Sequence, residues 1–220
     1  MITYLDAVNK VLLRLREPTV DTVQGTGSSN IYARMIGEFV NEAKAQVENS
    51  WDWSALRSTI SANTQADVYS YELNNTKTNV KVLNVLNDTS NYVMQYQSGQ
   101  WFDEQFLLHT NPKGSPVYYN FNGISADGDV MVDIFPIPDG VYNLRFNVTL
   151  RNPELSADTD TIVIPHRPII LLATAMAIEE RGEDGGQQSI NAYASSQRAL
   201  ADEIALDAAR HQEDTIWYQV

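Results

Sequence analysis

The sequence contains no cysteine and only three histidines, His109, His166 and His211. Without cysteine there are no disulfides, thiolate nucleophiles or cysteine-ligated metals. The histidines lie far apart and outside any recognisable catalytic or metal-binding motif, and no Gly-x-Ser-x-Gly elbow or Walker loop occurs. We therefore expect a protein that is not an enzyme and holds neither metal nor cofactor.

Long apolar runs and positive charge are also scarce. No run approaches the roughly 18 to 20 residues that span a bilayer, and the start, MITYLDAV, does not resemble a signal peptide. We expect a soluble protein made in a cytoplasm, without a membrane partner. The formal net charge of -13 argues against a surface that grips nucleic acid. An acidic surface still suits a channel through which DNA passes without being bound.

Two helices are predicted at the N-terminus. Thr3 is a candidate N-cap with Asp6 three residues on, so a first helix should run from about Tyr4 to Arg16, before Pro18. A second helix should end near Ser50 to Trp53. Its predicted buried face repeats every fourth residue, at Ile31, Met35, Phe39, Ala43, Val47 and Trp51. Four charged residues fall elsewhere on the helix: Glu38, Glu42, Lys44 and Glu48.

The middle of the chain, from about Leu56 to Thr161, has the texture of a β domain. Short runs rich in Val, Ile, Tyr and Phe alternate with turn clusters. Asp127 and Gly128 suit a tight hairpin. Alternation predicts Val130, Val132 and Ile134 on one face of a strand and Leu144, Phe146 and Val148 on one face of another.

Helical periodicity returns after residue 162. Ile169 to Glu180 is strongly apolar and ends at Arg181 and Gly182, and an alanine-rich helix follows. A mostly apolar seam is predicted along it, at Ile190, Tyr193, Gln197, Leu200, Ile204, Asp207 and His211. The predicted fold is α+β, with a four-helix bundle and an inserted antiparallel β domain, either sandwich-like or barrel-like. The predicted segments are 1–54, 55–162, 163–213 and a tail, 214–220.

Two aromatic groups are candidate functional residues. Trp51 continues the buried row of the second helix, whereas Trp53 lies outside it, so we expect the pair to cover the junction between bundle and β domain. In the tail, Ile216, Trp217, Tyr218 and Val220 either fold back onto the bundle or anchor in a groove on another protein. We favour the second reading.

Two rival functions follow from other residues. A carbohydrate-binding or adsorption module would stack sugars on the aromatics of the β domain: Trp101, Tyr118, Tyr119 and Tyr142. A tail hydrolase would use Asp103 or Glu104, although adjacency in sequence does not set the separation that two catalytic carboxylates need.

Several of these motifs, taken in order, resemble the head-to-tail adaptors of short-tailed bacteriophages, the tail tubular protein A family. The likeness covers about half of the chain. It lies in Ala7-Val8-Asn9, in Glu17-Pro18, in Ser50-Trp51-Asp52-Trp53 and in the strand-to-helix segment LSADTDTIVIPHRPIILLATAMAIEERGEDGG. Ser50 stands where the family usually has Gly, and Trp53 where it has Phe.

The resemblance implies a virion structural protein that forms a dodecameric ring between the portal and the tail nozzle, with a central channel for DNA. It further implies that the helices build the ring and that the C-terminal segment docks on the portal. Ile216, Trp217, Tyr218 and Val220 are then the portal-facing candidates.

Overall fold

The structure, a computed structural model, describes residues 1–25, 27–74, 76, 80–182 and 186–210. The chain divides into two compact units, described separately below. The helical unit comprises Met1–Leu56 and the described residues from Asn152 onward, and the β unit comprises Arg57–Arg151. The architecture is mixed α and β, with largely antiparallel sheets.

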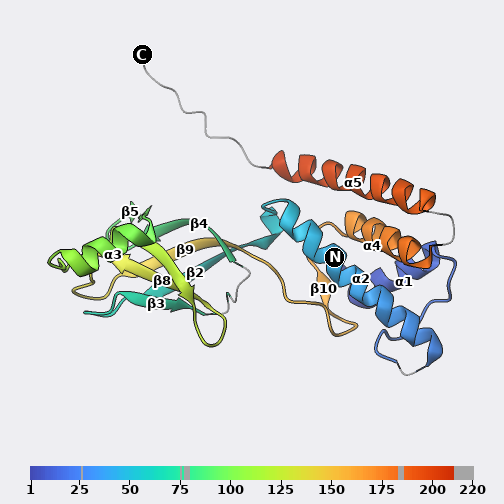
Figure 1. Cartoon of the computed structure of the whole chain (residues 1–220), viewed down its shortest axis with the longest axis horizontal. Coiled ribbons are helices and arrows are strands. Elements are labelled where there is room, and N and C mark those ends of the chain that lie inside the picture. The colour runs from blue at the N-terminus through green and yellow to red at the C-terminus, as the bar shows by residue number, and fades with distance from the viewer. Residues whose placement is uncertain (26, 75, 77–79, 183–185, 211–220) are drawn as a thin grey trace, which may run out of the picture. The chain divides into compact units, whose positions relative to one another are not determined.

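The helical unit contains α1 (Tyr4–Arg14), α2 (Ser28–Ser50), the 3-10 turn η1 (Ser54–Leu56), α4 (His166–Arg181) and α5 (Gln187–Ala208). In Figure 1, α4 lies between α5 and the α1–α2 pair. The short strands β1 (Ile2–Thr3) and β10 (Thr161–Ile162) pair antiparallel in this unit. Segment 152–162, which the sequence pattern placed with the β region, thus belongs with the helices.

Local signals in the sequence account for two helix ends. Oγ1 of Thr3 accepts a hydrogen bond from the backbone N–H of Asp6 at 3.2 Å, which confirms the predicted N-cap of α1. Helix α4 ends at Gly182, whose φ of 61° lies in the left-handed region that favours glycine. Helix α1 ends at Arg14, two residues before the predicted limit.

The buried face of α2 differs from the predicted row. It contains Ala33, Ile36, Val40, Ala43 and Val47, at alternating spacings of three and four, and Ile31 is 60% exposed. A row of every fourth residue drifts around a helix by about 40° per step, because each residue turns about 100°. Over five steps the predicted row therefore leaves the core at its Ile31 end.

Two charged residues of α2 are buried, contrary to their predicted place. Nζ of Lys44 lies 3.2 Å from Oε1 of Glu48 and donates hydrogen bonds to the carbonyl oxygens of Asn152 and Pro153 at 2.9 and 3.0 Å. The Asn41 side chain donates a hydrogen bond to the Leu155 carbonyl and accepts one from the Leu155 backbone N–H. Helix α2 thus binds the returning chain through polar side chains as well as by apolar packing.

The β unit has two four-stranded sheets that share one apolar core. The first has the order β2 (Arg57–Asn63), β9 (Asn143–Leu150), β4 (Val80–Asn87) and β5 (Tyr92–Val93). The second has the order β3 (Ser70–Leu73), β8 (Val130–Phe135), β7 (Tyr118–Ile124) and β6 (Gln95–Tyr96). Val132 and Ile134 of β8 meet Leu144, Phe146 and Val148 of β9 in this core, as predicted, whereas Val130 is only partly buried and lies outside it. The Gly128 hairpin between β7 and β8 is also confirmed.

Two features of the β unit were not predicted. Helix α3 (Gly99–Leu108) packs Trp101, Phe102 and Phe106 against Phe135, with ring centroids 5.4 to 6.5 Å apart. Strands β6 and β7 pair in parallel, whereas the sequence pattern predicted antiparallel pairing throughout.

Candidate assembly surfaces

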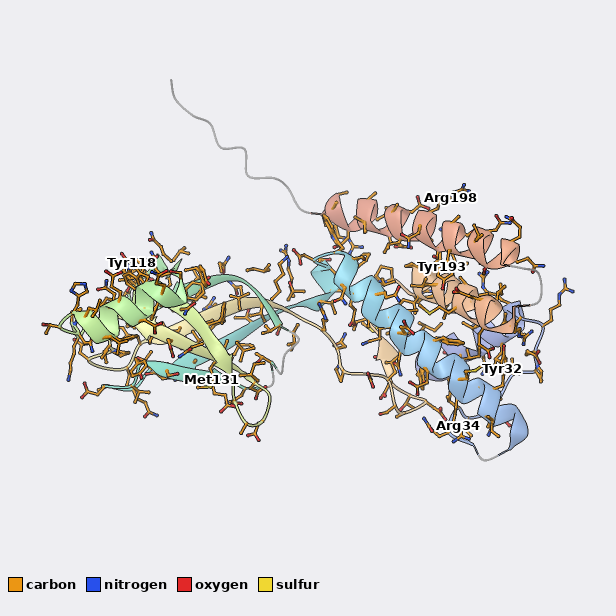
Figure 2. All side chains as sticks on the ribbon, in the orientation of Figure 1. Tyr32, Arg34, Tyr118, Met131, Tyr193 and Arg198 are labelled. Carbon is orange, nitrogen blue, oxygen red and sulfur yellow. The ribbon has the colours of Figure 1, made fainter. Side chains whose placement is uncertain are left out.

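Helix α5 has one side packed on α4 and one side open within its unit. Figure 2 shows Tyr193 on the side facing α4 and Arg198 on the opposite side. We call the exposed side the α5 outer face. It comprises Gln187, Gln188, Ile190, Asn191, Ala194, Ser195, Gln197, Arg198, Ala201, Asp202, Ala205 and Leu206.

The α5 outer face has few charges and several small side chains, at Ala194, Ser195, Ala201 and Ala205. Arg198 and Asp202 are its only charged residues, in a chain of net charge -13. Ile190 is 61% exposed, Leu206 is 63% exposed and Gln197 is also exposed, so the predicted apolar seam is wrong at Ile190 and Gln197. Small residues allow another helix to approach closely, and exposed apolar side chains favour protein contacts. The face suits contact with another protein surface.

The inner side of α5 is held by hydrogen bonds. The Tyr193 hydroxyl donates to Oε2 of Glu179 on α4 at 2.8 Å. Partial burial, together with this bond, raises the pKa of Tyr193 to about 12. Near the other end of α5, the buried Asp207 accepts hydrogen bonds from the Trp51 indole, the Ser54 backbone N–H and the Ser54 hydroxyl. Helix α5 is therefore held by side-chain hydrogen bonds at Tyr193 and at Asp207, and this supports its outer face.

A second polar cluster joins α4 to the chain between α1 and α2. Nη2 of Arg181 donates to Oε1 of Glu17 at 2.6 Å and Nε donates to the Tyr32 hydroxyl at 2.8 Å. Burial opposes the charge on Arg181, but these two bonds outweigh it and raise the pKa of Arg181. The hollow of about 140 Å³ beside them is lined by these three residues with Leu12 and Pro18, so its polar groups already have partners. We assign this cluster to the fold.

The two tryptophans singled out from the sequence both lie in the helical unit. Trp53 lies beyond the end of α2, is 1% exposed, and its indole donates to the Val47 carbonyl at 2.7 Å. Trp51 is half-buried against the same core. Their role as a cover between bundle and β domain stays a prediction. The portal candidates Ile216, Trp217, Tyr218 and Val220 lie outside the described residues.

The aromatics proposed for sugar stacking do not form one platform. Trp101 of α3 packs on Tyr118 of β7, with ring centroids 5.0 Å apart, and Tyr119 lies in the core between the sheets. Tyr142 donates a hydrogen bond to Asp139 at 2.6 Å. All four rings thus pack against other side chains or belong to a turn, as is usual for aromatic residues of a half-buried sheet.

The candidate catalytic and metal-binding residues are dispersed. Asp103 and Glu104 are exposed on α3, His109 follows that helix, and His166 begins α4. His211 lies outside the described residues. In the described part of the chain, no three His, Asp or Glu side chains gather as a metal site, and no helix has the length and apolar character to cross a bilayer.

Residues 2–218 match the model of the family described as SU10 adaptor protein. The chain belongs to this family. No curated protein is similar enough in sequence to be matched with it. The family match makes the chain a bacteriophage head-to-tail adaptor, a structural component of the virion that associates with other head and tail proteins. For such an adaptor, the surfaces of interest are those that meet other subunits, above all the α5 outer face.

Proposed function

We propose that the adaptor is a non-enzymatic ring protein between the portal and the tail nozzle of a short-tailed phage, of the tail tubular protein A type. The observation that carries the ring is the α5 outer face, which is nearly uncharged and exposes Ile190 and Leu206 on an otherwise acidic chain. Copies that pack head to tail through one such face and a different surface of the neighbour close into a ring.

The four helices of the helical unit act as one bundle in this proposal. Helix α4 contacts α1, α2 and α5, and α1 contacts α2. A single packed body suits a ring subunit, because it carries load between neighbours without internal movement. A dodecamer is the subunit number expected from the resemblance to tail tubular protein A.

The central channel would pass DNA without holding it. The chain carries 28 acidic against 15 basic residues, so a channel wall built from it repels phosphate. DNA then slides under ejection pressure with no bound intermediate.

Portal docking is assigned to the C-terminal segment, through Ile216, Trp217, Tyr218 and Val220. Asp207, fixed on Trp51 and Ser54, anchors the helix end that precedes this segment. Deletion of Asp214 to Val220 is expected to abolish co-purification with the portal while the melting temperature stays unchanged. If the truncated adaptor still co-purifies with the portal, the docking assignment is wrong.

A further inference from the structure

Strand β2 forms an open edge of the first sheet. Its seven residues pair with β9 in continuous register, from Arg57 opposite Thr149 to Asn63 opposite Asn143, with no bulge. It contains no proline and its only charged residue is Arg57, at its first position. Proteins usually protect edge strands with short length, proline, lysine or bulges. Apart from Arg57, β2 lacks these devices.

The hydrogen-bond pattern shows which backbone groups point outward. Thr64 donates its backbone N–H to the Tyr142 carbonyl at 2.9 Å, so residues 64 and 142 form a hydrogen-bonded pair. Hydrogen-bonded pairs alternate with non-bonded pairs along an antiparallel ladder. The backbone N–H and C=O groups of Ile60 and Ala62 therefore also point toward β9. The N–H and C=O groups of Thr59 and Ser61 therefore point away from the sheet. Among the described residues, no backbone bond reaches this outer side of β2.

The apolar core also reaches this edge without being closed. Ile60 and Ala62 pack against the core between the sheets but remain partly exposed. One more strand would cover their flanks and pair with the outward backbone groups, as in recognition by strand addition. The edge is thus incomplete both in hydrogen bonding and in apolar cover.

Charge at one end of the edge indicates the chemistry of the added strand. Arg57 and Lys81 lie on either side of Thr149 in the sheet, and Arg151 lies two residues beyond Thr149. Arg57 also lines a hollow of about 330 Å³, together with the side-chain amides of Asn84 and Asn147. Guanidinium and amide groups donate hydrogen bonds to carboxylates.

We propose that β2 receives an extended segment of another protein of the assembled particle, which adds a strand to this sheet. The segment places an apolar residue beside Ile60, small or polar residues beside Thr59 and Ser61, and a carboxylate at the Arg57 end. This contact is separate from ring closure through α5, so either can fail without the other.

Amide hydrogen exchange of the full-length chain tests the contact directly. The amides of Thr59 and Ser61 are expected to exchange freely in the isolated adaptor and in its self-assembled oligomer, and to become protected in purified virions. Those of Ile60 and Ala62, which face β9, should be protected in every state and serve as the internal control. Free exchange at Thr59 and Ser61 in virions would overturn the proposal.

Protection of Thr59 and Ser61 that is already present in the self-assembled oligomer, without other virion proteins, would also overturn the proposal, because the occupant would then be a second copy. Protection in the isolated native chain that disappears on deletion of Asp214–Val220 would do the same, because the occupant would then be the chain's own C-terminal segment. Mass measurement of the same oligomer sample reports ring formation independently.

A backbone variant provides the second arm. Ser61→Pro removes an outward N–H but no bond to β9, and proline is tolerated at such edge positions. Ser61→Ala changes the side chain and keeps the N–H. We expect Ser61→Pro to be lost from completed particles and Ser61→Ala to be retained. Equal incorporation of both variants would contradict strand addition.

Discussion

The Trp51 indole Nε1 donates a hydrogen bond to Oδ2 of Asp207 at 3.1 Å, across 156 residues of sequence. The same oxygen accepts the backbone N–H of Ser54 at 3.0 Å. One buried carboxylate therefore ties the last turn of α5 to the segment that follows α2. The end of α5 and the exit from α2 form a single polar joint, on which the α5 outer face depends for its position.

Asp207→Asn should destabilise this joint. An amide replaces the carboxylate with nearly the same shape, but its hydrogen bonds lose the negative charge, and bonds to charged groups contribute about 1.5 to 3 kcal/mol. We expect urea denaturation to show a loss of this order in the free energy of unfolding. Asp202→Asn is the matched control, because Asp202 is exposed and forms a surface ion pair with Arg167, at 4.0 Å. Equal losses of unfolding free energy in the two variants would show that the Asp207 hydrogen bonds do not stabilise this joint.

Gly37 allows α1 to approach α2. A Cβ atom at this position would lie 2.1 Å from the hydroxyl oxygen of Tyr4, a buried residue of α1. Helix propensity alone predicts that Gly37→Ala stabilises the protein, whereas overpacking predicts a loss of roughly 1 to 3 kcal/mol. We expect the loss, measured as a lower melting temperature.

A double variant separates this clash from other effects of the alanine. Tyr4→Phe removes the hydroxyl group, so Gly37→Ala should cost less in the Tyr4→Phe background than in the native one. Additive effects of the two substitutions would show that the Tyr4 hydroxyl is not the obstacle.

Lys44→Met should be more damaging than an ordinary surface substitution. Lys44 is 3% exposed, pairs with Glu48 and binds two carbonyl groups of the returning chain. Removing one partner of a buried ion pair costs about 3 to 5 kcal/mol, whereas replacing both is often tolerated. Lys44→Met with Glu48→Leu is therefore expected to recover part of the stability in chemical denaturation. A double variant with a lower free energy of unfolding than Lys44→Met alone would contradict this account.

Asp160 should titrate below the ordinary range of an aspartate. Oδ2 of Asp160 accepts the backbone N–H groups of Ser156 and Ala157 at 2.7 and 2.8 Å, and these bonds lower its pKa. A lowered pKa contributes stability above the unfolded-state value, which is lost as pH falls through the folded-state value. Carboxyl NMR titration should show this shift, and Asp160→Asn should weaken the acid dependence of stability. An unshifted titration would contradict the assignment.

The sequence predicted those features that depend on local chemistry. The Thr3 cap, the Gly182 stop and the inward faces of β8 and β9 follow from a side-chain cap, a left-handed position and strict alternation. It failed where distant segments decide. Lys44 is buried because Asn152 and Pro153 offer it carbonyl groups, and nothing near Lys44 in sequence signals that.

The candidate surfaces divide in the same way. The aromatic tail was visible in sequence as an unusual end, whereas the α5 outer face required knowing which side of the helix α4 covers. The scarcity of charge along α5 could have indicated that face. Ile190 was instead placed in the apolar seam on periodicity alone. The open edge of β2 follows only from the strand order, which alternation does not determine.

The mass of the adaptor assembled on purified portal tests the central claim most directly. The native chain is expected to form a closed ring, and Ala201→Arg, on the α5 outer face, should leave single subunits bound to the portal without closure. Ala126→Arg, the same change on an exposed turn of the β unit, should assemble as the native chain does. A closed ring formed by Ala201→Arg with native mass would contradict the account.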